Sequence, residues 1–217
     1  INGKVVPVSR SQRTLLRLKD ALTDLRRRGG KTREGGYNFI QKSGKLSGYI
    51  PGDKTSVIIP GSKNISRETL HNHPRNVGFS STDLFSALKN NEDRIHVVTP
   101  NGSWYKARVD SSILDYKDDI LHFEKNLHDI FLMEKMVEKK GNFDINDPKQ
   151  YFNSQVASKY ALLQDLNNNN VIDFRAKLSK KDKQIIKYYE PQVNKFLEQK
   201  KSYTQSKIDY DDYDEFL

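Results

Sequence analysis

The chain has 217 residues and no cysteine, with 35% hydrophobic and 30% charged residues and a mean hydropathy of −0.81. This composition excludes a membrane-spanning protein, because no run approaches the roughly 18 apolar residues that a spanning helix needs. The lack of cysteine excludes disulfides, thiolate zinc ligands and a cysteine nucleophile. The default expectation for the compartment is the cytoplasm, although a start at Ile1 is compatible with a larger, even secreted, polypeptide.

The charge is strongly positive and unevenly distributed. The 37 Lys and Arg residues outnumber the 28 Asp and Glu residues, which gives a formal net charge of +9. Residues 209–217 contain five acids and no base, so the rest of the chain carries +14. Such a surplus attracts polyanions and acidic protein surfaces without choosing between them. Nucleic acid is therefore a candidate partner, and the acidic tail either folds back on the basic body or stays solvated.

The first 110 residues mix helical and strand patterns. Leucines at three- and four-residue steps predict a helix that begins near residue 9 and stops at Gly29 and Gly30. Runs rich in aromatic and β-branched residues predict short strands, one of which leads into Leu70 and His71. The predicted strands cover residues 37–40, 46–50, 56–59, 95–98 and 103–109, with a helix over residues 81–90.

After residue 110 the pattern is helical. It predicts helices over residues 112–139, 148–166 and 179–200, the last with Pro191 inside, and a polar linker at Asn167–Asn170. We therefore expect an α+β fold in three parts. A mixed sheet flanked by helices spans residues 1–110, a mostly α-helical accessory region spans 111–208, and an acidic tail spans 209–217.

The most informative segment is His71-Asn72-His73-Pro74. Two histidines one residue apart on an extended strand face the same side, roughly 7 Å apart along the backbone. Asp83 lies at the start of the next predicted helix and can return a carboxylate to the same point. Two imidazoles and one carboxylate leave the fourth position of a tetrahedral zinc for water, as in catalytic sites. The alternative interpretation is a capped loop with two solvated histidines.

A catalytic zinc site also needs a general base that takes a proton from water and hands it to the leaving amine. Glu34 is the preferred candidate, because it precedes the first predicted strand, where sheet formation carries it to the metal. Glu68, three residues before His71, is the competitor, and we expect it to face another direction. Ser80 or Ser81 can donate a hydrogen bond to the developing oxyanion.

The run from His71 to Asp83, HNHPRNVGFSSTD, resembles the metal-binding signature of the JAB/MPN (JAMM) metalloprotease superfamily. That signature has an upstream Glu, then His-x-His-Pro, a short loop and Ser-x-x-Asp. The resemblance covers about residues 9–110. Within the superfamily, the motif is similar to those of bacterial, phage and mobile-element branches, including the RadC-like ones. Asp83 follows His73 by ten residues, one fewer than in the family's pattern. Keeping the Ser-x-x-Asp spacing selects Ser80 over Ser81.

The resemblance implies a fold, a site and an activity. It implies a JAB/MPN-like fold in which His71, His73 and Asp83 ligate Zn²⁺, Glu34 activates the water and Ser80 steadies the tetrahedral intermediate. The family hydrolyses amide or isopeptide bonds, often beside the C-terminal tail of ubiquitin-like proteins, so the implied substrate is a protein or peptide. The alternative hypothesis is a non-catalytic, effector or toxin module on a JAB-like scaffold, holding nucleic acid or a partner protein through its basic surface.

The other histidines fit a zinc site less well. His96 lies inside an apolar strand pattern, where a hydrogen-bonded core histidine is the usual role. His122 and His128 are six residues apart on a predicted helix, which places them on opposite sides. Trp104 is expected to pack on the core.

Overall fold

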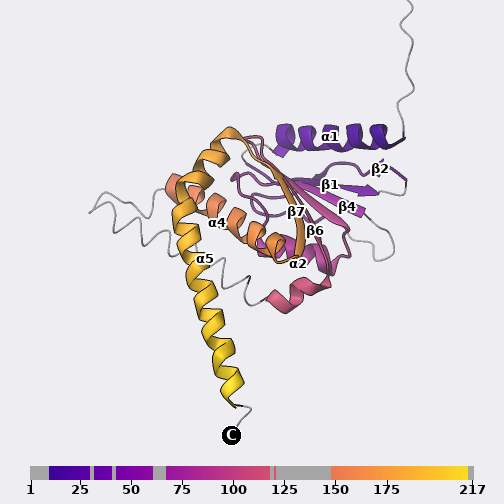
Figure 1. Cartoon of the computed structure of the whole chain (residues 1–217). Helices are drawn as coiled ribbons and strands as arrows, with labels where there is room; N and C mark the ends of the chain where they lie inside the picture. Colours follow the sequence, from indigo (N-terminus) through magenta and orange to yellow (C-terminus); the bar gives the residue numbers. More distant parts are fainter. Residues whose placement is uncertain are drawn as a thin grey trace, which may run out of the picture.

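The computed structural model describes residues 10–29, 32–40, 43–60, 67–117, 120 and 148–214. Within these ranges four strands follow the first helix, two more strands follow the second helix, and a further strand lies between the two last helices (Figure 1). The helices are α1 (Arg10–Gly29), α2 (Ser81–Lys89), the 3₁₀ helix η1 (Ser111–Tyr116), α4 (Pro148–Asn168) and α5 (Lys180–Asp214). The strands are β1 (Gly35–Ile40), β2 (Lys45–Leu46), β3 (Ile50–Pro51), β4 (Arg67–Asn72), β5 (Arg94–Val98), β6 (Trp104–Val109) and β7 (Ile172–Lys177).

The strands form one mixed seven-stranded sheet in the order β2-β1-β4-β5-β6-β7, with β3 paired to β1. β4 and β5 run parallel, whereas the other described pairs are antiparallel. The chain leaves the end of β4, passes through α2 and returns in β5. The predicted α+β fold with a mixed sheet flanked by helices is therefore confirmed.

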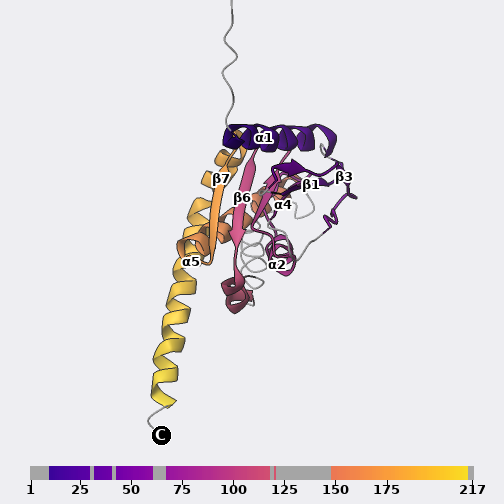
Figure 2. The ribbon, with the colours of Figure 1, turned by 90° about the vertical axis from the view of Figure 1, so that its right-hand side faces the viewer.

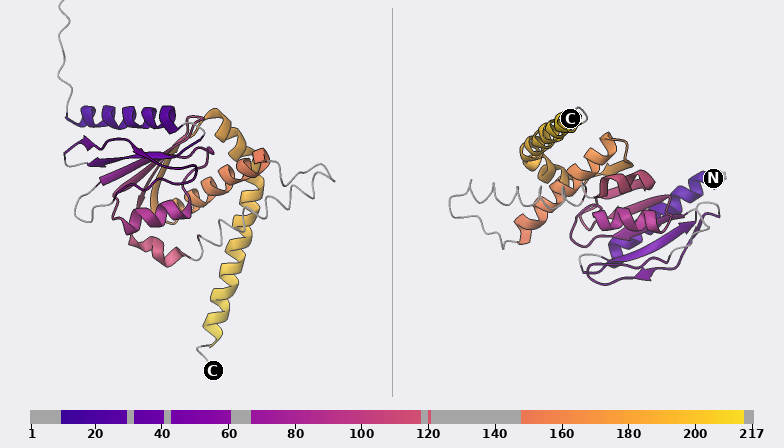
Figure 3. Two further views of the ribbon diagram at one scale, coloured as in Figure 1. Left: turned by 180° about the vertical axis from the view of Figure 1, so that it is seen from behind. Right: turned by 90° about the horizontal axis from the view of Figure 1, so that it is seen from below.

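Helices cover both faces of the sheet, as the views from the front, from behind and from below show (Figures 1 and 3). On one face α1 packs its buried Leu25 on Phe39 of β1 and Leu70 of β4. On the other face α2, α4 and α5 share a single core with β5, β6 and β7. Large buried side chains of that core come from both halves of the chain, namely Phe79, Leu84, Ile95, Tyr105, Ile113, Leu162, Leu163 and Phe174.

Several elements differ from the sequence prediction. Residues 56–60 form no strand, and the strand predicted at residues 46–50 is split into β2 and β3. η1 takes the place of the first turns of the helix predicted at residues 112–139, most of which lies outside the described residues. β7 follows directly after the polar tract predicted as a linker. α5 continues through Pro191 to Asp214, so the predicted boundary at residue 209 lies inside this helix.

α5 is the longest described helix, and its C-terminal end points away from the sheet (Figure 1). Its composition is mixed polar and apolar along the whole length. None of the described helices combines the length and the hydropathy that crossing a bilayer requires.

Candidate metal centre

β4 places the two histidines of the His-x-His pair on one side of the sheet. His71 is paired with Gly36 on β1 and with Val97 on β5. Beyond the last residue of β4, the backbone N–H of His73 still donates to the Val98 carbonyl at 3.0 Å. This bond keeps His73 extended, so both rings face the same way and their Nε2 atoms lie 3.0 Å apart.

α2 supplies the carboxylate. Asp83 is the third residue of this helix and forms a capping box with Ser80, the N-cap. The backbone N–H and the hydroxyl of Ser80 both donate to Asp83 Oδ2 at 2.7 Å, and Ser80 Oγ accepts from the Asp83 N–H at 3.2 Å. These bonds fix the Asp83 carboxylate, whose Oδ1 lies 3.3 Å from His71 Nε2 and whose Oδ2 lies 3.6 Å from His73 Nε2.

The three side chains fit one tetrahedral cation. A zinc ion with ligands at about 2.0–2.2 Å separates neighbouring donor atoms by roughly 3.3–3.6 Å. The separations among His71, His73 and Asp83 are 3.0, 3.3 and 3.6 Å. They are the one group of three His, Asp or Glu side chains within the described residues whose ligand atoms converge in this way. Three ligands leave a fourth position open, as in a catalytic rather than a structural site.

The ring of His73 is oriented by the loop that follows it. Its Nδ1 lies 3.0 Å from the carbonyls of both Val77 and Gly78. Because carbonyl oxygens only accept, Nδ1 carries the proton and Nε2 keeps its lone pair for a metal. Asn76, with a φ of 59°, makes the turn that brings these carbonyls back beneath the ring.

The electrostatics favour cation binding at neutral pH. Burial lowers the pKa of His73 to about 4, so this ring is neutral. Although burial alone would raise the pKa of Asp83, the two histidine rings and the Ser80 hydroxyl hold it well below its usual range. Burial opposes the charged form of His71, but the hydrogen bond and the charge of Asp83 outweigh it and raise its pKa. The centre therefore combines one carboxylate charge with a neutral imidazole.

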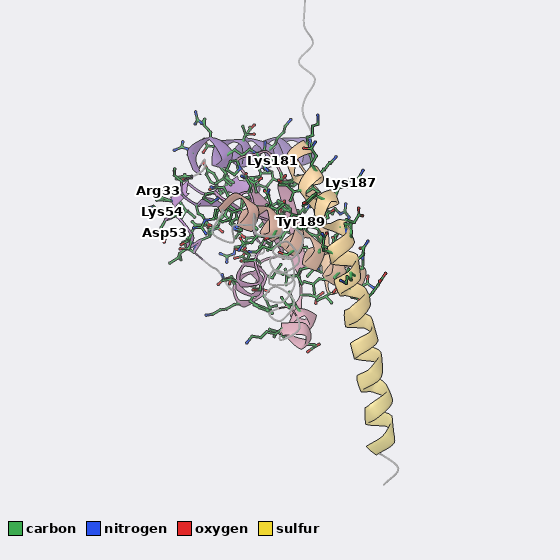
Figure 4. The ribbon with its side chains drawn as sticks, turned by 90° about the vertical axis from the view of Figure 1, so that its left-hand side faces the viewer. Arg33, Asp53, Lys54, Lys181, Lys187 and Tyr189 are labelled. Carbon is green, nitrogen blue, oxygen red and sulfur yellow. The ribbon has the colours of Figure 1, made fainter. Side chains whose placement is uncertain are left out.

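Glu34 lies at the entrance to β1 and lines the same cleft as the three ligand side chains. Its backbone is held on both sides, since its N–H donates to Asp53 O at 2.7 Å and its carbonyl accepts from Gly52 N at 3.0 Å. Asn72 Nδ2 donates to the Arg33 carbonyl at 2.8 Å. Arg33 and Asp53 lie together at one side of the molecule (Figure 4). The side chain is 9% exposed, and burial raises the pKa of Glu34 to about 7, where a carboxylate can take and release a proton.

Glu68, the competing base, is held on the opposite face of the sheet. It is three residues from His71, and strand residues an odd number apart face opposite sides. Glu68 Oε2 accepts from His96 Nε2 at 2.5 Å, and Oε1 accepts from Arg94 at 3.3 Å. His96 is 0% exposed, and its Nδ1 accepts from Trp104 Nε1 at 3.2 Å. His96 is thus the hydrogen-bonded core residue that the sequence predicts, and His122 and His128 lie outside the described residues.

The two serines differ in position. Ser80 lines the cleft, whereas Ser81 is buried at the start of α2 and is not among the residues that line it. The single hydroxyl proton of Ser80 is donated to Asp83. The structure therefore gives Ser80 a role in holding the carboxylate, and its support of an oxyanion stays a prediction.

The cleft has a volume of about 680 Å³ and includes residues that the sequence did not single out. α4 contributes Gln155 and Lys159, and the charge of Lys159 acts to lower the pKa of His73. Arg75 lies at the rim, with its guanidinium 5.2 Å from the centre of the Phe152 ring. No local pattern marks these α4 residues, because their place depends on how the helix packs.

The deep end of the cleft is polar. Glu92 accepts hydrogen bonds from Thr69 of β4 and from Arg67. The Arg67 and Glu92 side chains are both buried and form an ion pair at 3.3 Å. The cleft thus has an acidic, hydrogen-bonded inner end beside Ile95 and a rim that carries Arg75 and Lys159.

Comparisons of the chain with protein-family models, with curated proteins and with solved structures found no match. The grounds for a functional proposal are therefore the geometry of the cleft and the signature between His71 and Asp83.

Proposed function

We propose that this chain is a zinc-dependent hydrolase of amide bonds, a metallopeptidase or isopeptidase with a JAB/MPN-like catalytic fold. The observation that carries the proposal is the spacing of the His71, His73 and Asp83 donor atoms, which corresponds to the edges of a tetrahedron around one ion. A bound Zn²⁺ supplies a Lewis acid that lowers the pKa of a coordinated water towards neutrality.

In this proposal Glu34 moves the proton. A carboxyl group with a pKa of about 7 accepts a proton from water at neutral pH and can donate it to the leaving amine. Its attachment through the Asp53 and Gly52 backbone keeps it at the cleft wall. Ser80 holds Asp83 and, when its hydroxyl turns towards the cleft, supports the developing oxyanion.

The substrate that suits this cleft is an extended polypeptide, such as the C-terminal tail of a ubiquitin-like protein. Residues 56–60 line the cleft and belong to none of the described strands. Ile58 in this segment is 86% exposed. An extended peptide can pair with such a segment through its backbone while its side chains enter pockets on alternate sides.

The proposal is tested by exchanging the two candidate bases. We expect the wild-type protein, loaded with zinc, to cleave at least one member of a panel of ubiquitin-like fusions and fluorogenic peptides. Glu34→Gln should lower the rate by about 10²–10⁴-fold, because it removes the proton acceptor, while zinc content measured by atomic absorption stays at the wild-type level. The matched variant Glu68→Gln, on the other face of the sheet, should cleave like the wild type.

Two results would contradict the assignment. Cleavage by Glu34→Gln at the wild-type rate would remove Glu34 from the mechanism. A zinc-loaded wild-type protein that cleaves no member of the panel would count against the hydrolase itself.

A further inference from the structure

The face of the sheet opposite the cleft is basic at its β7 end. On β6, Tyr105 and Ala107 belong to the core shared with α4, so Lys106 and Arg108 point to the other face. The same alternation on β7 buries Ile172 and Phe174 and turns Arg175 and Lys177 outwards. We call the outward-facing set the basic sheet face, and its members are Arg94, Lys106, Arg108, Arg175 and Lys177.

The described helix on this face, α1, packs on β1, β4 and β5 and reaches Trp104 at the start of β6. Figure 2 shows β6 and β7 below α1, with α4 and α5 behind them. Arg108 and Lys177 are exposed, and the Arg175 side chain is 81% exposed. The charges are therefore accessible to a large ligand.

One of the same-face pairs between β6 and β7 joins two cations, whereas Arg108 stands opposite Asp173 and Lys177 opposite Trp104. Lys106 and Arg175 are direct partners in the β6–β7 register, and like charges in that position destabilise a strand pair. Asp173 lies 3.6 Å from Arg175, and Glu68 pairs with Arg94. The remaining three cations, Lys106, Arg108 and Lys177, form no ion pair with an acid of the described ranges. A bound anion would relieve this repulsion.

The same residues line a hollow. Arg94, Lys106, Arg108, Asp173 and Arg175 surround a space of about 130 Å³. Arginine presents a planar fork of N–H donors that matches the oxygens of a phosphate. Same-face residues lie roughly 6.6–7 Å apart along a strand and about 4.8 Å apart across strands. The face is thus a regular array of cations suited to a polymer of phosphates.

The composition of this face favours nucleic acid over an acidic protein. Protein–protein interfaces have apolar, aromatic centres that are depleted of lysine. Interfaces with nucleic acid are more polar and much more positively charged. Trp104, directly opposite Lys177, is half-buried and packs against the α1 cluster and parallel to His96, so the accessible part of the basic sheet face consists of charged side chains. A sheet face that carries an open array of cations can follow the phosphate backbone of a single strand.

We propose that the basic sheet face binds the phosphate backbone of single-stranded nucleic acid, at a site separate from the cleft. The proposal does not depend on the hydrolase assignment, because the two sites lie on opposite faces of the sheet. Binding should be sequence-tolerant and should weaken as salt rises, since each phosphate contact releases a counterion.

Fluorescence anisotropy of a labelled 20-nucleotide single strand of mixed sequence tests the proposal with the full chain. The sheet-face variant carries Lys106→Gln, Arg108→Gln and Arg175→Gln. The control variant carries Lys181→Gln, Lys183→Gln and Lys187→Gln on α5, where Figure 4 labels Lys181 and Lys187. Both variants lose three positive charges from side chains of the surface, and thermal unfolding followed by circular dichroism verifies that each is folded.

We expect the affinity of the sheet-face variant to fall by at least about tenfold, and its slope of log K against log salt to decrease in magnitude by about 2. The affinity of the control variant should stay within about threefold of the wild type. No binding by the wild type at 50 mM salt, or an equal loss in both variants, would overturn the proposal. A labelled polyglutamate of 20 residues serves as the acidic polypeptide probe. Binding of this probe as tightly as the nucleic acid would overturn the choice of partner, as would salt-sensitive self-association through the acidic residues 209–215.

Discussion

At the scale of single residues, two of the three ligand side chains of the cleft, His73 and Asp83, are held by partners outside the ligand set. The Val77 and Gly78 carbonyls orient His73, and Ser80 holds Asp83 through both its backbone and its hydroxyl. Such partners fix the tautomer of a ligand and the direction of its lone pair before a metal arrives. The cleft is therefore preorganised for a cation.

Ser80→Ala tests this support. The change removes both the hydroxyl that donates to Asp83 Oδ2 and the N-cap acceptor of α2. We expect the free energy of unfolding of the metal-free protein to fall by about 1 kcal/mol, measured by urea denaturation. We expect zinc affinity to fall by about 10–100-fold, measured by titration. Ser80→Thr keeps a hydroxyl and should restore most of both losses. Unchanged zinc affinity in Ser80→Ala would show that the hydroxyl does not orient Asp83.

The sequence predicted the local part of this site. Alternation along a strand places His71 and His73 on one side, and a serine three residues before Asp83 is a capping signal, so their convergence followed from short-range rules. The position of Glu34 in the cleft depends on how β1 pairs within the sheet. Strand alternation also places the Glu68 side chain on the face opposite His71. Lys159 could not be predicted, because it reaches the cleft through the packing of α4.

At the scale of secondary-structure elements, the most accurate predictions concern helices and strands with a clear local sequence pattern. The leucine spacing of α1 gave its length and its buried side, where Ala21 and Leu25 contact the sheet. The β5–β6 hairpin agrees with the strands predicted at residues 95–98 and 103–109, and Gly102 between them has the positive φ of 97° that favours glycine.

The strand predicted at residues 56–59 does not form, and the cause lies in the residues that precede the apolar run. Asp53 accepts from the backbone N–H groups of Thr55 and Ser56, each at 2.7 Å, and so makes a tight turn. The following residues then run along the cleft instead of joining the sheet, which leaves Ile58 exposed. A β-branched run predicts an extended backbone, but it does not predict a pairing partner.

β7 was missed although its sequence alternates. Ile172 and Phe174 are buried, whereas Asp173 and Arg175 are exposed, as in a strand with one face towards solvent. The run is short, follows four asparagines and pairs with β6, more than sixty residues earlier in the chain. Pairing over such a distance leaves no local signal.

At the scale of the whole molecule, the two halves of the chain share one core. Leu162 and Leu163 of α4 and Phe174 of β7 lie in the same cluster as Val97 and Ala107 of the central strands. Asp182 of α5 adds polar contacts, since it accepts from Ser103 at 2.5 Å and from Asn101 at 2.6 Å. The change of pattern at residue 110 is therefore a change of composition within one folded unit of the described chain.

Truncation after residue 147 tests whether the first half of the chain needs the shared core in order to fold. The fragment 1–147 loses α4, β7 and α5, which exposes Tyr105, Ala107 and the rest of one sheet face. We expect it to lack a cooperative thermal unfolding transition by circular dichroism, because the lost side chains form about half of that core. Truncation after residue 200 keeps the packed part of α5, including Leu197, and should unfold like the full chain. A cooperative transition of the fragment 1–147 at the full-length temperature would contradict the shared core.

The central claim, a single cation held by His71, His73 and Asp83, is tested most directly by calorimetric titration of the metal-free protein with Zn²⁺ at pH 7.5. Asp83→Asn can still accept from the Ser80 N–H and so keeps the helix cap, while it loses the ligand charge. Asp20→Asn, on the exposed side of α1, is the matched control. Affinity should fall at pH 5.5, because the raised pKa of His71 lets protons compete with the metal. The account predicts one zinc per chain in the wild type and in Asp20→Asn, and at least a hundredfold weaker binding in Asp83→Asn. A wild-type protein that takes up no zinc, or an Asp83→Asn protein that binds it as tightly, would contradict the account.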